Sequence, residues 1–305
     1  GRIATQNAKN VILQKIREEE RKSLYKDWYA KEKDIVPGVV QRYLGRNVSI
    51  NLGKADAILN ESEQVKGEVF QPTQRIKVYV LEVKDTPKGP RISVSRTHPD
   101  LVKRLFELEV AEVKDGTVEI RSIAREAGSR TKIAVMSNDP NVDPVGACVG
   151  LNGARVNSIV SELRGEKIDI INWDENPAYL IENALSPAKV ICVVADEEAR
   201  EAQVIVPDYQ LSLAIGREGQ NARLAAKLTG FKIDIKSETQ ARETGLFEEM
   251  GMDYQTEEGT FERYEEYEPY EGGYEQEYEA ADQADFEDGY QAGYQDNYQD
   301  DVIPE

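Results

Sequence analysis

Two short turns in this sequence are built to hold an anion. Gly150-Leu151-Asn152-Gly153 and Gly216-Arg217-Glu218-Gly219 each place two glycines three residues apart, directly before a helical pattern. The first turn of a helix has unpaired backbone N–H groups and carries the positive end of the helix dipole, so it attracts anions. Glycine has no side chain and lets a sugar-phosphate chain come close to the backbone. The pattern therefore predicts two seats for a phosphate backbone.

Basic and polar side chains follow both turns. The candidates for contact with nucleic acid are Arg155, Arg164 and Lys167 after the first turn, and Gln220, Asn221, Arg223 and Lys227 after the second. The first turn carries no charge, and in the second Glu218 offsets Arg217. Residues 98–240 hold 17 basic and 23 acidic residues, which is not the basic surface typical of a nucleic-acid-binding domain. We therefore expect modest affinity, resting on backbone N–H groups, these side chains and a hydrophobic groove, with shallow salt dependence.

Each turn lies inside a longer duplicated unit. "VGACVGLNGARVNSIVSELRGEKIDI" (145–170) and "LSLAIGREGQNARLAAKLTGFKIDI" (211–235) share the glycine turn, the helix after it and a closing "KIDI" strand. A helical pattern and two alternating strands precede each copy. The predicted units cover 98–174 and 175–240. One pair of glycines at this spacing is weak evidence, whereas two pairs in the same context are specific.

The residues before the duplication predict a long charged helix and a small barrel. Apolar residues recur at helical spacing over 1–33. Alternating residues punctuated by Gly45, Gly53 and "PKGP" over 34–97 predict short strands closing into a small barrel of the OB type. Tyr43, Phe70 and Tyr79 either stack on bases or only fill and cover the barrel, and the sequence leaves both alternatives open.

The C-terminal residues 241–305 have a different composition. They hold 22 acidic and 2 basic residues, and nine of the 15 tyrosines of the chain lie there. With almost no aliphatic side chains, this tail is expected to be disordered. We expect it to act either as a solubilising tail or as an imitation of a single nucleic-acid strand that competes for the surfaces of the duplicated units and the barrel. Without the tail, the rest of the chain has a net charge of +1.

Catalytic and metal-dependent functions find no support in the sequence. No phosphate-binding ATPase loop, nucleophile elbow or paired Cys and His ligands occur, so we expect no catalytic residues, metal or cofactor. His98 stands at a predicted helix start and is expected to cap or pack. Cys148 and Cys192 lie far apart, which suits a reducing compartment. No apolar run is long enough to cross a bilayer, so we expect a cytoplasmic protein without membrane partners.

The duplicated units resemble KH domains, which clamp about four nucleotides of single-stranded RNA at such a turn. Their strand order resembles the type II arrangement. A barrel of the S-one ribosomal class followed by two such units resembles the NusA family of bacterial transcription factors. The similarity is carried by "GRIATQNAKNVILQKIREEER" (1–21), "SRTHPDL" (95–101), "SNDPNVDPVGACVG" (137–150) and "LAIGREGQNARLAAKLTG" (213–230). It implies an α+β multi-domain protein with tandem type II KH domains.

The resemblance also implies a function. Residues 1–33 correspond to the end of an N-terminal domain that contacts RNA polymerase, most of which is absent from this sequence. The expected partners are single-stranded nascent RNA, RNA polymerase and other Nus-type factors, and the expected role is to modulate pausing, termination and antitermination. Two alternatives are an accessory subunit of an RNA-decay complex and a protein-binding scaffold with inert glycine turns.

Overall fold

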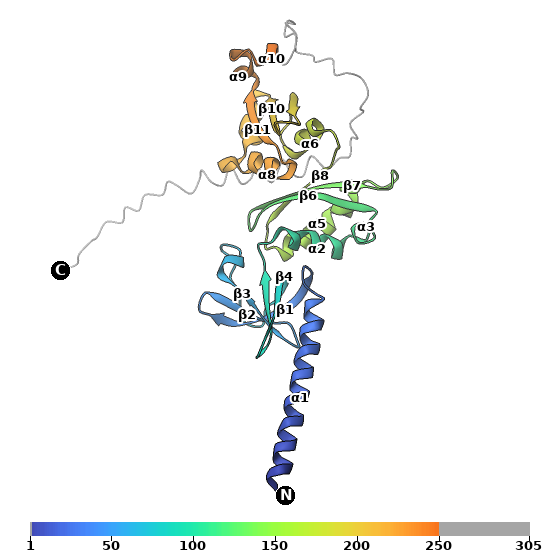
Figure 1. Cartoon of the computed structure of the whole chain (residues 1–305). Helices are drawn as coiled ribbons and strands as arrows, with labels where there is room; N and C mark the ends of the chain where they lie inside the picture. Colours follow the sequence, from blue (N-terminus) through green and yellow to red (C-terminus); the bar gives the residue numbers. More distant parts are fainter. Residues whose placement is uncertain (1, 250–305) are drawn as a thin grey trace, which may run out of the picture. The chain divides into compact units, whose positions relative to one another are not determined.

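The computed structural model describes residues 2–249, and the part of the expected tail from residue 250 onward lies outside the described residues. The chain begins with the long helix α1 (Arg2–Tyr29) (Figure 1). The last turns of α1 pack on the barrel through Trp28, whose side chain is buried. Val11, Ile12 and Ile16, in the first half of this helix, are exposed.

Five strands form a closed barrel after α1. They are β1 (Ile35–Leu44), β2 (Asn47–Asn51), β3 (Asp56–Leu59), β4 (Arg75–Thr86) and β5 (Gly89–Ser95), in the order β1-β2-β3-β5-β4. The β3–β5 pair is parallel and the other pairs are antiparallel. A short 3₁₀ helix (Glu61–Glu63) follows β3. Alternate β-branched side chains fill the interior, among them Val48, Ile50 and Val78, which are fully buried. The barrel predicted from the alternating pattern is therefore present.

The first duplicated unit is a three-stranded sheet with helices on one face (Figure 1). Its elements are α2 (Pro99–Glu109), α3 (Ala111–Lys114), β6 (Val118–Glu126), β7 (Arg130–Ser137), α4 (Pro144–Val149), α5 (Ala154–Glu162) and β8 (Lys167–Asn172). The strand order is β6-β7-β8, with β7 antiparallel to β6 and parallel to β8. His98 caps α2 by accepting a hydrogen bond from the N–H of Asp100, as expected.

The second unit repeats this arrangement. It contains α6 (Pro177–Ala184), β9 (Cys192–Asp196), β10 (Glu201–Val206), α7 (Leu211–Ile215), α8 (Gln220–Thr229) and β11 (Lys232–Ser237), with the sheet order β11-β10-β9. β10 is parallel to β11 and antiparallel to β9. The helix–strand–strand–helix–turn–helix–strand order predicted for both units is thus observed.

Ordered structure continues beyond residue 240, where the sequence led us to expect a disordered tail. Helices α9 (Glu238–Glu243) and α10 (Leu246–Glu249) follow β11. Ser237 and Gln240 form a reciprocal capping box that starts α9, and Ala241, Leu246 and Phe247 are buried. The predicted start of the tail at residue 241 was therefore wrong, because three apolar side chains between 241 and 247 are buried in the fold.

The modules are joined by buried contacts rather than by loose linkers. Arg96, between the barrel and the first unit, is 1% exposed and donates hydrogen bonds to the carbonyl oxygen of Lys77 at 2.9 Å and to Glu162 at 3.0 Å. It also pairs with Glu68. Between the two units, Ala124 and Ala134 of the first share one apolar cluster with residues such as Leu224 of the second. No helix among residues 2–249 is long and apolar enough to cross a membrane.

Candidate nucleic-acid interface

The two glycine turns have the same backbone conformation. Gly150 and Gly216 have φ/ψ of 75°/174° and 76°/170°. The third residue is left-handed in both turns, with φ of 52° at Asn152 and 53° at Glu218. The first position lies in a region that essentially only glycine adopts. The shape of the turn therefore requires glycine before any ligand is considered.

The turns also fold closely over the helices that follow them. A Cβ atom on Gly216 would lie 2.8 Å from the backbone nitrogen of Asn221. A Cβ atom on Gly150 would lie 2.7 Å from Cγ of Arg155. From the sequence, these glycines are expected to let a sugar-phosphate chain approach the backbone. The structure shows that glycine is already required at these positions because a Cβ atom would clash with the helix that follows each turn.

Each turn presents backbone donors at its tip. The N–H groups of Gly150 and Gly153 donate to Gly146 and Gly150, and those of Gly216 and Gly219 donate to Ser212 and Gly216. Within the described part of the chain, these bonds do not use the N–H groups of the two central residues of either turn. The central residues are exposed, and Leu151 is 85% exposed. Two adjacent N–H groups at a turn of this kind can form a small concave anion site.

Two arginines that the sequence placed at the first RNA seat have other partners. Arg155 donates to the carbonyl oxygen of Ala147 at 2.7 Å and to Glu112 at 2.9 Å, so it supports the turn from below. The guanidinium of Arg164 lies 3.2 Å from a carboxylate oxygen of Glu68 in the barrel. Both arginines therefore support the protein in this structure, because nearby carboxylates neutralise them.

Asn221 was predicted to contact RNA, and the structure places it in the interior. Its side chain belongs to a residue that is 6% exposed, and its amide nitrogen donates to the carbonyl oxygens of Leu185 and Ala214, both at 3.0 Å. It occupies the position after its turn that Arg155 occupies after the first turn. Asn221 therefore ties the turn to the core and does not face a ligand.

Gln220 and Arg223 lie beside the second turn and reach the first unit. Gln220 donates to Glu126 at 2.9 Å and to Ser129 at 2.7 Å. Arg223 donates to both carboxylate oxygens of Glu126, at 2.5 and 3.1 Å. The hydrogen bond from Arg223 holds the pKa of Glu126 below its usual range. These two side chains, predicted to contact RNA, connect the two units instead.

The three other basic candidates also lie at the surface, as Arg164 and Arg223 do. Arg217, Lys167 and Lys227 are exposed. Neither Arg217 nor Lys227 takes part in an ion pair with another residue of the described range. Of the six arginines and lysines predicted to contact RNA, Arg155, Arg164 and Arg223 are paired with carboxylates of this protein.

The barrel rings differ in exposure. Phe70 is 2% exposed and lies in the barrel core, and Tyr79 is 3% exposed and stacks on His98 at 4.5 Å. Neither ring can stack on a base, so the alternative that they fill the protein is correct for both. Tyr43 is 47% exposed, and its hydroxyl accepts a hydrogen bond from the N–H of Phe70 at 3.1 Å. Tyr43 stays a candidate platform.

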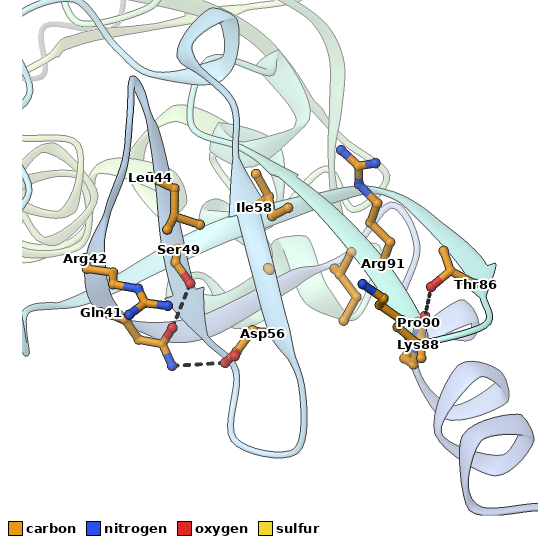
Figure 2. Close-up of a pocket in the computed structure, with 13 residues that line it drawn as sticks. Gln41, Arg42, Leu44, Ser49, Asp56, Ile58, Thr86, Lys88, Pro90 and Arg91 are labelled. Carbon is orange, nitrogen blue, oxygen red and sulfur yellow. Dashed lines mark hydrogen bonds between the residues drawn. The ribbon is translucent and has the colours of Figure 1, made fainter. Parts of the chain in front are cut away.

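A hollow on the barrel contains basic residues that the sequence did not single out. It has a volume of about 380 Å³, and Figure 2 shows Arg42 on one side and Lys88 and Arg91 on the other. Gln41 lies on the same side as Arg42, accepting from Ser49 at 2.6 Å and donating to Asp56 at 3.1 Å. Two features of the sequence could have identified this hollow, namely the alternating residues of β1 and the basic residues of the β4–β5 hairpin. Together they place these side chains on one face of the barrel.

A buried ion pair lies within the first unit, between a residue of β6 and the residue before β8. Arg125 donates to Glu166 at 2.8 and 2.9 Å, and both side chains are fully buried. Burial would raise the pKa of Glu166, but the hydrogen bonds from Arg125, Thr131 and the N–H of Gly128 lower it overall. The matching position of the second unit holds Phe231, with the guanidinium of Arg200 5.1 Å from its ring centre.

Comparisons with known proteins agree with this architecture. Residues 96–173 match the NusA-like first KH domain and residues 177–243 match the NusA-like second KH domain. The transcription termination/antitermination protein NusA of Bacillus subtilis is 58% identical over 247 residues, covering 81% of this chain and 67% of the relative. The proteins of that name from Mycobacterium tuberculosis and Thermus thermophilus are 49% and 46% identical, covering 78% and 77% of this chain and 71% and 61% of the relatives. The chain belongs to the NusA family of transcription termination/antitermination proteins.

Proposed function

We propose that this chain is an RNA-binding transcription elongation factor that associates with RNA polymerase and nascent RNA and modulates pausing, termination and antitermination. The observation that supports it most directly is the pair of glycine turns with matching dihedral angles, each placing before a helix two exposed residues whose N–H groups are not used by the hydrogen bonds of the turn. The names of its relatives give the transcriptional context.

The proposed RNA seats use fewer side chains than the sequence suggested. At the first turn, the backbone of Leu151 and Asn152 binds phosphate, and Lys167 on β8 adds charge. At the second, the backbone of Arg217 and Glu218 does so, with the Arg217 and Lys227 side chains contributing charge. Arg42, Lys88 and Arg91 form a third site on the barrel, where a strand can pair its phosphates. The exposed ring of Tyr43 lies outside this hollow and offers a separate platform on which a base can stack.

Avidity is the proposed mechanism. Each site neutralises few phosphates and binds weakly, since most nearby arginines are paired with carboxylates. The buried contacts of Arg96 and the shared apolar cluster keep the sites at fixed separations. A strand held at one site therefore meets the others at a high effective concentration.

The RNA seats are tested by placing negative charge at the turn tips. Leu151→Asp with Asn152→Asp, and Arg217→Asp with Glu218→Asp, change exposed residues and leave the required glycines in place. Each pair should weaken binding of a 12-nucleotide single strand by roughly tenfold in a filter-binding titration. The matched controls, Leu151→Asn and Glu218→Asn, add no negative charge and should bind at least as well as the wild type. Unchanged affinity in both charged variants, with an intact fold, would favour the scaffold with inert turns.

The association with polymerase is tested separately. Affinity purification of the tagged natural protein from its own cells should recover RNA polymerase subunits after nuclease treatment. Recovery of a ribonuclease complex without polymerase would favour the RNA-decay alternative. The absence of catalysis stays a prediction, and degradation of labelled RNA by the purified protein would contradict it.

A further inference from the structure

The guanidinium of Arg223 attaches the second glycine turn to the first unit. Nε and Nη2 of Arg223 donate to the two carboxylate oxygens of Glu126, the last residue of β6, at 2.5 and 3.1 Å. The remaining nitrogen, Nη1, donates to the backbone carbonyl oxygen of Glu218 at 3.1 Å. One side chain therefore connects a carboxylate of the first unit with the left-handed residue at the tip of the second turn.

A second connection lies on the other side of the turn. Gln220 directly follows Gly219 and begins α8. Its amide nitrogen donates to Glu126 at 2.9 Å and to Ser129 in the β6–β7 hairpin at 2.7 Å. The residue before Gly219 and the residue after it are thus both held by the same carboxylate, one through Arg223 and one directly.

The carboxylate is itself fixed. The side chain of Glu126 is 22% exposed, and the hairpin that carries it is held by the hydrogen bond from the N–H of Gly128 to Glu166 at 2.8 Å. Below the first turn, Arg155 bonds Ala147 and Glu112, both of the same unit. Among residues 2–249, support from the other unit is therefore given to the second turn and not to the first.

We propose that Glu126 is a positioning residue for the RNA seat of the second unit. It orders the turn 216–219 through Arg223 and Gln220, so the second seat is complete only when the first unit is present. This inference rests on the proposed function for the identity of the ligand. Its mechanical part, the ordering of the turn, concerns the RNA-free protein.

Electrostatics makes the proposal easy to separate from a charge effect. A carboxylate beside a polyanion repels it, so by charge alone removing Glu126 should tighten RNA binding. Positioning predicts the opposite, because the disordered turn must be ordered again by the ligand. The sign of the change in affinity therefore distinguishes the two effects.

The test uses the full chain with Glu126→Gln, Arg223→Gln and the double variant. Glu119→Gln, which removes an exposed carboxylate of the same strand, is the control. In the absence of RNA, amide hydrogen exchange at Gly219 and Gln220 should be about fivefold faster than in the wild type in both single variants. The double variant should exchange no faster than the single variants, because the two residues act through the same contact. Gly153 and Ala154 of the first turn should not change.

Binding of a single-stranded RNA dodecamer is the second measurement. Glu126→Gln should weaken it about threefold while Glu119→Gln leaves it within error. Unchanged exchange at Gly219 and Gln220, additive effects in the double variant, or tighter RNA binding by Glu126→Gln would each overturn the proposal. If the wild-type chain binds no RNA, the proposed function fails, whereas the exchange data still decide whether Glu126 orders the turn.

Discussion

The first and second KH units build the same glycine turn and stabilise it with different side chains. Below the first turn, Arg155 bonds a carbonyl and a carboxylate at a partly exposed site. Below the second, Asn221 bonds two carbonyls in the interior. Where the closing strand begins, the first unit buries Glu166 against Arg125 and the second buries Phe231. A backbone conformation fixed by glycine thus tolerates an ionic or an amide support, and the start of the closing strand tolerates an ion pair or an aromatic ring.

The largest expected effect breaks the ionic support. Glu166→Gln leaves the buried guanidinium of Arg125 without a counter-charge and should lower the free energy of unfolding by about 3 kcal/mol. Phe231→Leu at the matching position of the second unit should cost only about 1 kcal/mol. Urea denaturation of both variants checks this. Equal losses would mean that the buried pair contributes no more than an apolar side chain.

The glycines themselves should rank by what a methyl group meets. Gly216→Ala combines a glycine-only conformation with a clash against the backbone of Asn221 and should cost about 3 kcal/mol. Gly150→Ala meets the flexible Arg155 side chain, so about 2 kcal/mol is expected. Gly219→Ala meets only the tip of Arg223, 4.0 Å away, and should cost about 1 kcal/mol. Thermal unfolding of the three variants tests the order.

The amide and arginine supports should differ in the same direction. Asn221→Ala removes the side-chain donor to two buried carbonyl oxygens, of which that of Leu185 still accepts from the N–H of Ala188, and should destabilise by about 2 kcal/mol. Arg155→Ala removes a partly exposed pair whose groups water can solvate, so less than about 1 kcal/mol is expected. Chemical denaturation at neutral pH measures both. A costlier Arg155→Ala would reverse the comparison.

Acid should weaken the first unit through Glu166. Since its pKa in the folded protein is below the unfolded value of about 4.3, its stabilisation is present above that pH and is lost as the pH falls through the folded pKa. Melting temperatures measured from pH 7 to 3 should therefore fall more steeply in the wild type than in Glu166→Gln. The matching Phe231 has no titrating group. Parallel curves would show that other carboxylates account for the acid sensitivity.

The smallest effect concerns the charge of the two turn tips. Arg217→Gln should make the slope of log affinity for RNA against log salt shallower by about 0.7, because one phosphate contact is lost. Leu151→Gln at the equivalent position of the first turn removes no charge and should leave the slope unchanged. Titrations at four salt concentrations resolve the difference. An altered slope in Leu151→Gln would contradict the assignment of a charged and an uncharged seat.

The fold could be predicted largely from local patterns. Glycine spacing, the repeated "KIDI" strand and the alternation over 34–97 depend on residues close in sequence, so the turns, the two units and the barrel follow from them. The helix α9 was also readable, since Ser237 and Gln240 have the spacing of a capping box. The acidic composition of the residues further along, which predicts disorder, competes with this local signal.

The free or paired state of each arginine could not be predicted in this way. Arg223 pairs with Glu126, 97 residues earlier, and Arg164 with Glu68 in another domain. Such partners come together only through the packing of whole modules, on which sequence spacing carries no information. The burial of Phe70 depends likewise on how the segment between β3 and β4 crosses the barrel.

The burial of Arg96 has a practical consequence for dividing this chain. A polypeptide that stops at Ser95 leaves Glu68 in the barrel without its cation, and one that starts at Thr97 deprives Glu162 of the same group. An isolated barrel and an isolated KH pair should each consequently be less stable than the same module within the whole chain. Expression of the barrel and the KH pair as one polypeptide that includes Arg96 keeps the ion pairs of Arg96 with Glu68 and Glu162.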